Sequence, residues 1–352
     1  MAHRTSISLS MVILAATLLP ATAQADEPSR DRVEQLEFDP QTGEWIEIEP
    51  PEPGTPEGDL AIARRHLADG HTGRARKAFK KWFKNHGEAH GLVREVRLGL
   101  AAVELGARNY YKAYGILEPL AAEFGTDDVT LQAVEMEFVI AEVFLSGTKR
   151  KWLGMRIKDG EELGIKILDD IAFNYPDTDL AEKALKTKAD HYFQRGDFDL
   201  AEDEYASLIT SFPRSQWLLA ASLRRAQATL AQFPGTDFDD AALIEAEERF
   251  LRFRTDFPQA AQPHDVDLTL EDIRNRRAQK EFEIGQYYAK VGQDRASAFY
   301  YRSVIDNWPG TVAATRATAV LAQMGLLREA FSEPLTRASE PKLDGSSTGV
   351  QQ

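Results

Sequence analysis

The chain has 352 residues, of which 43% are hydrophobic and 28% charged, a composition typical of a folded protein rather than a disordered one. Its formal net charge of −14 disfavours a general role in binding nucleic acid. The sequence contains no cysteine, which excludes disulfide bonds, thiolate metal sites, cysteine nucleophiles and a lipid-modified cysteine.

Residues 1–25 have the features of a secretory signal peptide. A weakly basic start precedes an apolar core from Met11 to Leu19, and Ala23-Gln24-Ala25 fits a small-x-small cleavage site. We therefore expect export and cleavage after Ala25. The alternative is an uncleaved anchor, although the apolar stretch is short for a span of a bilayer.

Residues 26–58 are acidic and rich in proline, which predicts an extended linker. Within it, residues 38–45 place turn-forming residues between apolar ones, a pattern typical of a small β-hairpin. Alternatively, Trp45 and Ile48 dock on the helices that follow. At the other end, residues 331–352 hold few apolar side chains and are predicted to be a disordered tail.

Residues 59–330 contain a repeated pair of helices, which is clearest from Glu182 to Arg214. Its first helix has apolar or small residues on one face and its second helix has another such set, at Leu185, Ala189, Tyr192, Ala201, Tyr205 and Leu208. Phe212-Pro213 closes the unit, because proline cannot continue a helix. These spacings resemble the tetratricopeptide repeat, in which small residues let two helices cross closely.

Looser copies of the same core recur along this region. The small residue near the start of the second helix recurs as Ala75, Ala113, Gly164, Ala201, Ala246 and Ser297. The large residue four positions later is Phe79, Leu117, Leu168, Tyr205, Phe250 or Tyr301. A third apolar residue follows at Trp82, Leu120, Ile171, Leu208, Phe253 and Val304. The sequence thus predicts an all-α tetratricopeptide-repeat solenoid of about six helical hairpins, with a C-terminal capping helix near Val312 to Leu326.

No pattern in the chain indicates catalysis. There is no phosphate-binding glycine loop and no nucleophile elbow. His86 and His90 have a helical spacing suited to a metal, but Gly87 and Gly91 indicate a turn there. We therefore expect no enzyme activity, no cofactor and no metal site. A hydrolase of cell-wall material is the remaining enzymatic alternative, and it would need two or more carboxylates converging in a cleft.

One segment is basic in this acidic chain: ten Lys or Arg residues oppose three acidic ones between Arg64 and Arg97. The predicted helix from Gly73 to Asn85 could be a membrane-surface helix. We favour a core role for its apolar side and expect its lysines to attract an acidic partner or anionic headgroups. The basic patch comprises Lys77, Lys80, Lys81 and Lys84, with Lys149, Arg150 and Lys151 in an insert between repeats.

The order of these features resembles the BamD-like family of outer-membrane protein assembly factors, across roughly Gly58 to Leu327. The most specific stretch is Ile273 to Thr311, with its Tyr287-Tyr288 pair, its Tyr301-Arg302 step and its closing Trp308-Pro309-Gly310-Thr311. That family is anchored by a lipidated cysteine. Since this sequence has none, it is a non-lipidated variant, held by partners and charge or free in the periplasm.

The resemblance implies a scaffold at the periplasmic face of the outer membrane or in the periplasm. Its partners would be the barrel-assembly core protein, docked near Tyr287, Tyr288, Tyr301 and Arg302, and unfolded outer-membrane proteins. In the clearest repeat, the side chains expected on the concave, peptide-binding side are Lys186, Asp190, Phe193 and Gln194. The alternative function is a periplasmic repeat adaptor that coordinates envelope constriction or wall synthesis.

Overall fold

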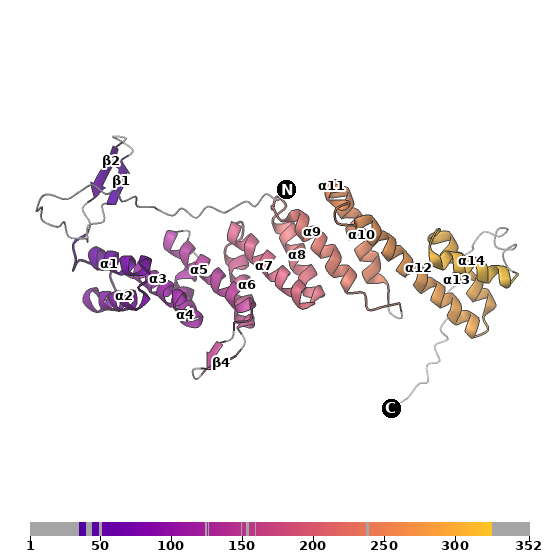
Figure 1. Cartoon of the computed structure of the whole chain (residues 1–352), viewed down its shortest axis with the longest axis horizontal. Coiled ribbons are helices and arrows are strands. Elements are labelled where there is room, and N and C mark those ends of the chain that lie inside the picture. The colour runs from indigo at the N-terminus through magenta and orange to yellow at the C-terminus, as the bar shows by residue number, and fades with distance from the viewer. Residues whose placement is uncertain are drawn as a thin grey trace, which may run out of the picture. The chain divides into compact units, whose positions relative to one another are not determined.

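The structure is a computed structural model of the chain. It describes residues 35–39, 44–48, 51–123, 125, 127–148, 150–152, 155–158, 160–236 and 239–325, with the strands described by their backbone alone. The expected signal peptide with its cleavage after Ala25, much of the 26–58 linker and the 331–352 tail lie outside these residues. The chain divides into two units, residues 1–96 and 97–352, each described by itself (Figure 1).

The N-terminal unit contains a β-hairpin and a helical hairpin. Strands β1 (Gln35–Asp39) and β2 (Glu44–Ile48) pair antiparallel, with Phe38 opposite Trp45, as the turn chemistry predicts. Helices α1 (Pro56–Ala68) and α2 (Thr72–His86) pack on one another. The first helix begins inside the predicted linker, since Pro56 has no N–H to leave unpaired in the first turn and the Thr55 hydroxyl accepts the Gly58 N–H.

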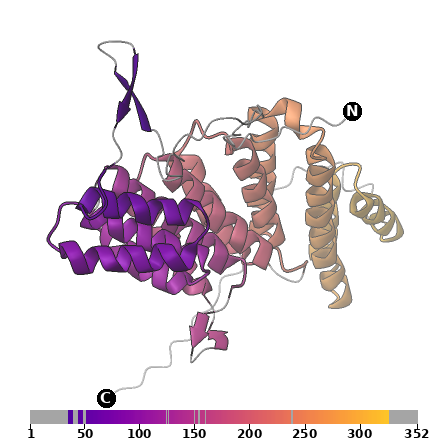
Figure 2. The ribbon, with the colours of Figure 1, turned by 60° about the vertical axis from the view of Figure 1, so that its left-hand side comes forward.

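The second unit is built from helices that follow one another in space as they do in sequence (Figures 1 and 2). They are α3 (Val93–Gly106), most of which belongs to this unit, α4 (Tyr110–Ala121), α5 (Asp128–Leu145), α6 (Glu161–Asn174), α7 (Asp179–Arg195), α8 (Phe198–Ser211), α9 (Leu218–Ala231), α10 (Ala241–Asp256), α11 (Pro258–Ala261), α12 (Val266–Lys290), α13 (Asp294–Asn307) and α14 (Val312–Gln323). A second small hairpin, β3 (Arg150–Trp152) and β4 (Met155–Lys158), forms in the basic insert between α5 and α6.

The packing between helices is that of stacked pairs. From α4 onward each long helix packs on the next, and first helices also touch across a repeat, as α5 does with α7 and α7 with α9. The described residues therefore hold the expected succession of six helix pairs, α1/α2 to α12/α13, followed by α14. The prediction of a tetratricopeptide-type helical solenoid is confirmed, with two short β-hairpins in addition.

The small and large positions of the repeat form its core. Every small residue predicted near the start of a second helix is buried, as are all the large residues four and seven positions later. Gly164 shows why small residues are required: a Cβ there would stand 3.1 Å from the carbonyl oxygen of Ala141. Because volume changes in close-packed interiors are costly, the small residue at this recurring position determines how closely the paired helices approach.

Second helices end where the sequence predicts. Helices α6, α8, α10 and α13 stop just before an aromatic residue and a proline, at Tyr175-Pro176, Phe212-Pro213, Phe257-Pro258 and Trp308-Pro309. The aromatic residue also ties repeats together, since the Tyr175 hydroxyl donates to the carbonyl oxygen of Ala121 on α4 at 2.7 Å. None of the described helices combines the length and apolar composition that crossing a bilayer needs.

Candidate partner-binding groove

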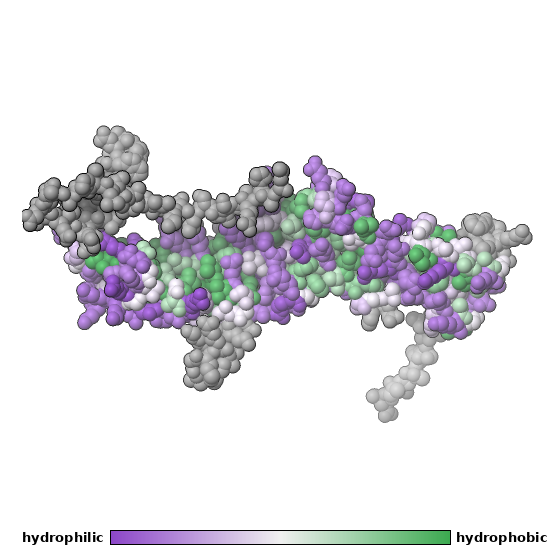
Figure 3. All heavy atoms as spheres, in the orientation of Figure 1, coloured by the Kyte–Doolittle hydropathy of each residue, from purple (hydrophilic) through white to green (hydrophobic). Residues whose placement is uncertain are grey.

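A pocket of about 190 Å³ opens between α7, α8 and α9. We call it the α7–α9 groove, and its lining residues are Lys186, Asp190, Tyr205, Leu208, Trp217, Ala220, Ala221 and Arg224. Lys186 and Asp190 are two of the four residues that the sequence predicts for a concave, peptide-binding side. In the view of Figure 3, hydrophobic residues reach the surface around α8 to α10, among hydrophilic neighbours.

The wall on α7 is polar and held in place by its neighbours. The Lys186 ammonium donates to Asp190 at 2.6 Å, one helical turn further on. Asp190 also accepts a hydrogen bond from the Tyr205 hydroxyl on α8. Burial, the hydrogen bond to Asp190 and the charge of Asp190 raise the pKa of Tyr205. Tyr205 therefore stays a neutral donor, and it orients Asp190 from the side opposite Lys186 by holding the other carboxylate oxygen.

The wall on α9 presents an aromatic ring, a cation and two small residues. Trp217, Ala220, Ala221 and Arg224 stand at i, i+3, i+4 and i+7, so they share one face of the helix. The alanines leave the space of the pocket open. The Lys186 Nζ lies 5.8 Å from the centroid of a Trp217 ring, within cation–π range.

Phe193 lies at the edge of this groove. Its ring is half-buried, and the Arg224 guanidinium carbon stands 4.6 Å from the ring centroid. Gln194 is exposed and does not line the pocket. The groove thus offers two cations, one carboxylate and aromatic surfaces. That chemistry suits a partner segment carrying an acidic and an aromatic or aliphatic side chain.

Sequence reasoning missed the α9 half of the groove. Its signal was present, because Trp217 follows the Phe212-Pro213 closer and Arg224 lies seven residues later. The sequence-based prediction placed binding residues on α7 alone, the first helix of one repeat. The pocket is also lined by α9, the first helix of the next repeat. Only their packing across α8 brings Lys186 and Trp217 together.

The predicted docking residues near the C-terminus form a second group, on α12 and α13. Tyr287 is 61% exposed, so its ring is accessible to a partner. Tyr288 is half-buried and stacks on Tyr300 with 5.3 Å between ring centroids. Arg302 is half-buried on α13. Tyr301 is 2% exposed and belongs to the core, so it does not present its ring to a partner.

The basic patch on α2 is accessible, but the apolar side of this helix is not. Lys77, Lys80, Lys81 and Lys84 are exposed and make no ion pair among the described residues. On the opposite side Trp82 is fully buried, and its indole N–H donates to the Pro56 carbonyl oxygen at 2.7 Å. The alternative that the apolar side of this helix inserts into a membrane is therefore wrong. The exposed lysines can still attract an acidic partner or anionic headgroups. In the insert, Arg150 and Lys151 lie on β3, while Lys149 lies outside the described residues.

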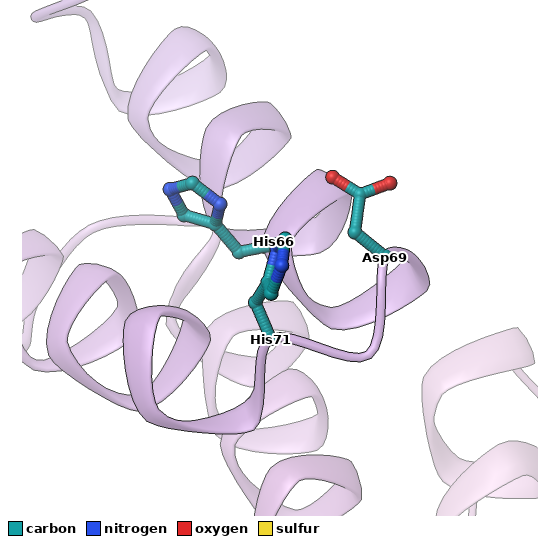
Figure 4. Close-up of side chains that lie close together, drawn as sticks. All are labelled: His66, Asp69 and His71. Atoms are coloured by element: carbon teal, nitrogen blue, oxygen red, sulfur yellow. The ribbon is translucent and has the colours of Figure 1, made fainter.

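The turn between α1 and α2 gathers three residues that could hold a metal ion (Figure 4). His66, Asp69 and His71 each offer a ligand atom, and these atoms lie within 4.8 Å of one another. The cause is a Schellman motif: the His71 N–H bonds to the His66 carbonyl and the Gly70 N–H to that of Leu67. This motif brings residues 66 and 71 together, a pairing that a search for i, i+4 spacings overlooks. Two imidazoles and a carboxylate would suit a divalent transition metal, completed by water.

His86 and His90, which have a helical spacing in the sequence, bind other groups of the chain. His86 contacts Asp59 at 2.9 Å, and the His90 Nδ1 accepts the backbone N–H of Leu92. Both rings pack against Trp82. Gly87 has a φ of 79°, which confirms the predicted turn between them. This pair is therefore not arranged as a metal site.

Comparison with protein families gives a match over part of the chain. The family model YfiO, described as outer membrane lipoprotein, matches residues 159–329. This span begins just before α6 and includes α7, α8 and α9, so the whole groove lies within it. No curated protein matches the chain. The match over residues 159–329, with the helical repeats that they form, thus supports the BamD-like outer-membrane lipoprotein family that the sequence resembles.

Proposed function

We propose that this protein is a non-enzymatic scaffold in the assembly of outer-membrane β-barrel proteins, and that it holds partner segments in the α7–α9 groove. The observation that carries the proposal is the groove itself: a preformed pocket, with cations and aromatic rings on two first helices, inside the family-matched region. Helical-repeat proteins commonly bind extended or helical segments on such surfaces.

The proposed location is the periplasmic face of the outer membrane, which the family description supports. The proposed partners are the periplasmic domains of the barrel-assembly core protein, near Tyr287, Tyr288 and Arg302, and unfolded barrel proteins in the groove. Because the sequence contains no cysteine, a lipid cannot be attached through one. Instead, we propose that partners and the exposed lysines of α2 hold the protein at the membrane.

The test is co-purification from cell envelopes after mild extraction. The expected result is recovery of the barrel-assembly core protein with the wild-type chain. Recovery of unfolded barrel proteins should fall in the Arg224→Glu variant, because it places a negative charge beside Asp190 in a groove that otherwise carries two cations. Arg252→Glu is a matched control, since Arg252 is exposed on α10 and does not line the groove.

Three results would count against the proposal. Absence of the core protein from the wild-type sample would remove the assembly role. Recovery of wall-synthesis or constriction proteins in its place would favour the adaptor function. Equal recovery of unfolded barrel proteins with both variants would remove the groove as their binding site.

A further inference from the structure

A second pocket lies in a different part of the fold, among α4, α5 and α6. Its volume is about 170 Å³. The residues that line it are Tyr114, Glu118, Ala121, Ala122, Glu137, Asp170, Ile171, Asn174 and Tyr175. It is acidic, since three of them are carboxylic acids. No residue of this pocket belongs to the α7–α9 groove.

Glu137 is the unusual member of this pocket. It stands on α5 between core residues, and only 6% of it is exposed. Its Oε1 is fully buried and has no hydrogen-bond partner among the described residues. Burying a carboxyl group without a partner costs free energy, so such a group in a folded protein calls for an explanation. Glu137 also lines the pocket, so a ligand held there is a candidate for the missing partner.

The lysine and tyrosine donors around Glu137 bind other acceptors. On α6 the Lys166 ammonium binds Asp170 at 2.5 Å, and on α4 the Tyr114 hydroxyl donates to Glu118 at 3.2 Å. The Tyr175 hydroxyl donates to the backbone of Ala121. Lys166 thus offsets one carboxylate, and the pocket keeps an excess of negative charge. Burial, Glu118 and Asp170 raise the pKa of Glu137 to about 8, while Lys166 opposes them.

The shape and chemistry of the pocket restrict its ligand. Among the described residues, its three carboxylates do not all lie close enough together to hold a metal ion jointly. Its volume is below the roughly 300–1,000 Å³ of pockets for drug-sized molecules, so a sugar chain does not fit inside. A single cationic side chain does fit. A guanidinium group is planar, carries five donors and stacks on aromatic rings, so Glu137, Glu118 and the Tyr114 ring match it well.

We propose that the α4–α6 pocket is a socket for an arginine side chain of a partner protein, with Glu137 as its buried anion. The guanidinium would donate to the unpartnered Oε1 of Glu137 and replace the proton that this group holds when the pocket is empty. Binding therefore releases a proton and strengthens as pH rises. The inference does not rest on the proposed assembly role, because any partner with an exposed arginine could use the socket.

The experiment titrates the full chain with a blocked tripeptide, acetyl-Gly-Arg-Gly-amide, and with its glutamine counterpart. Chemical shifts of the protein are followed at about pH 6 and about pH 9, on either side of the Glu137 pKa. We expect the arginine peptide to bind at least tenfold more tightly at the higher pH, since only the ionised carboxylate accepts it. The glutamine peptide should bind much more weakly at both.

Two variants locate the site. Glu137→Gln keeps the shape of the side chain, and we expect it to weaken arginine binding at least tenfold at high pH and to abolish the pH dependence. Glu135→Gln is the matched control, since Glu135 is exposed on the same helix. Glu118→Gln, at the more open side, should weaken binding while the pH dependence remains.

Several outcomes would contradict the proposal of an arginine socket. They are equal binding of the two peptides, binding that ignores pH, and arginine binding that survives Glu137→Gln. Hydrolysis of cell-wall glycan by the wild-type chain, lost in Glu137→Gln, would also overturn it, because these acids would then be catalytic. Failure of the assembly proposal would show in co-purification instead, so the two results are distinguishable.

Discussion

Gly285 of α12 lies directly against the ring of Tyr301 on α13, and a Cβ at position 285 would stand 2.7 Å from Tyr301 Cε1. Tyr301 is buried and cannot swing away without disturbing the last helix pair. We expect Gly285→Ala to destabilise this repeat by about 1–3 kcal/mol, because overpacking outweighs the gain in helix propensity. Thermal melting followed by circular dichroism measures it.

The control for this substitution is Gly115→Ala on α4. Gly115 is exposed within a helix and has nothing within 4 Å of where a Cβ would stand. Alanine there should stabilise the protein by roughly 0.5–1 kcal/mol, through helix propensity alone. Opposite shifts of the melting temperature in the two variants support the close contact between Gly285 and the Tyr301 ring. Stabilisation in both would contradict it.

Lys188 of α7 bridges two neighbouring helices from a buried position. It binds Asp169 on α6 and Glu204 on α8, the latter at 2.8 Å. Lys188→Met leaves Glu204 without its cation, and burial already raises the pKa of Glu204. We expect a loss of roughly 2–3 kcal/mol, partly restored by adding Glu204→Gln. Thermal melting of Lys188→Met, of Glu204→Gln and of the double variant gives the coupling free energy between Lys188 and Glu204. A coupling free energy near zero would contradict the bridge.

The raised pKa of Glu137 predicts how stability depends on pH. The folded state holds this proton up to about pH 8, whereas an ordinary glutamate releases it near 4.5. The stabilising contribution of the protonated group is therefore complete below about pH 4.5 and is lost as pH rises to about 8. We expect the melting temperature of the wild type to fall relative to that of Glu137→Gln across this window. Parallel curves would show that Glu137 titrates normally.

The lysines of α2 predict salt-dependent attachment to anionic membranes. Charge reversal of Lys80, Lys81 and Lys84 should reduce binding to phosphatidylglycerol vesicles by at least tenfold at low salt, since each lysine contributes about 1 kcal/mol. High salt should weaken the wild type similarly, by screening. Reversal of the exposed Lys183 and Lys290 is the control. Vesicle binding by the triple variant at wild-type strength would reject this role for the patch.

The fold was predictable because its core repeats. Ala201, Tyr205 and Leu208 occupy positions that recur through the chain, and each set proved buried. Closing prolines fixed the ends of second helices, since a proline acts locally. The β-hairpin near Phe38 and Trp45 was likewise readable from its turn residues.

The sites were less predictable, because they combine residues whose proximity depends on packing. Lys186 and Asp190 follow from the register of one helix, but their pairing with Trp217 depends on α8 between them. Glu137 looks in sequence like any other acid of a charged chain. Only the packing of α4 and α6 over it produces burial without a partner. The pairing of His66 with His71 depends on the left-handed backbone of Gly70, which reverses the chain between them.

The most direct test of the central claim is site-specific photo-crosslinking in intact cells. A photoreactive residue replaces Ala220, which is exposed on the α9 wall of the α7–α9 groove, or Leu200, which is exposed on α8 outside it. We predict crosslinks from position 220 to unfolded β-barrel proteins, and far fewer from position 200. If position 220 captures no unfolded barrel protein above the level of position 200, the groove does not serve barrel assembly.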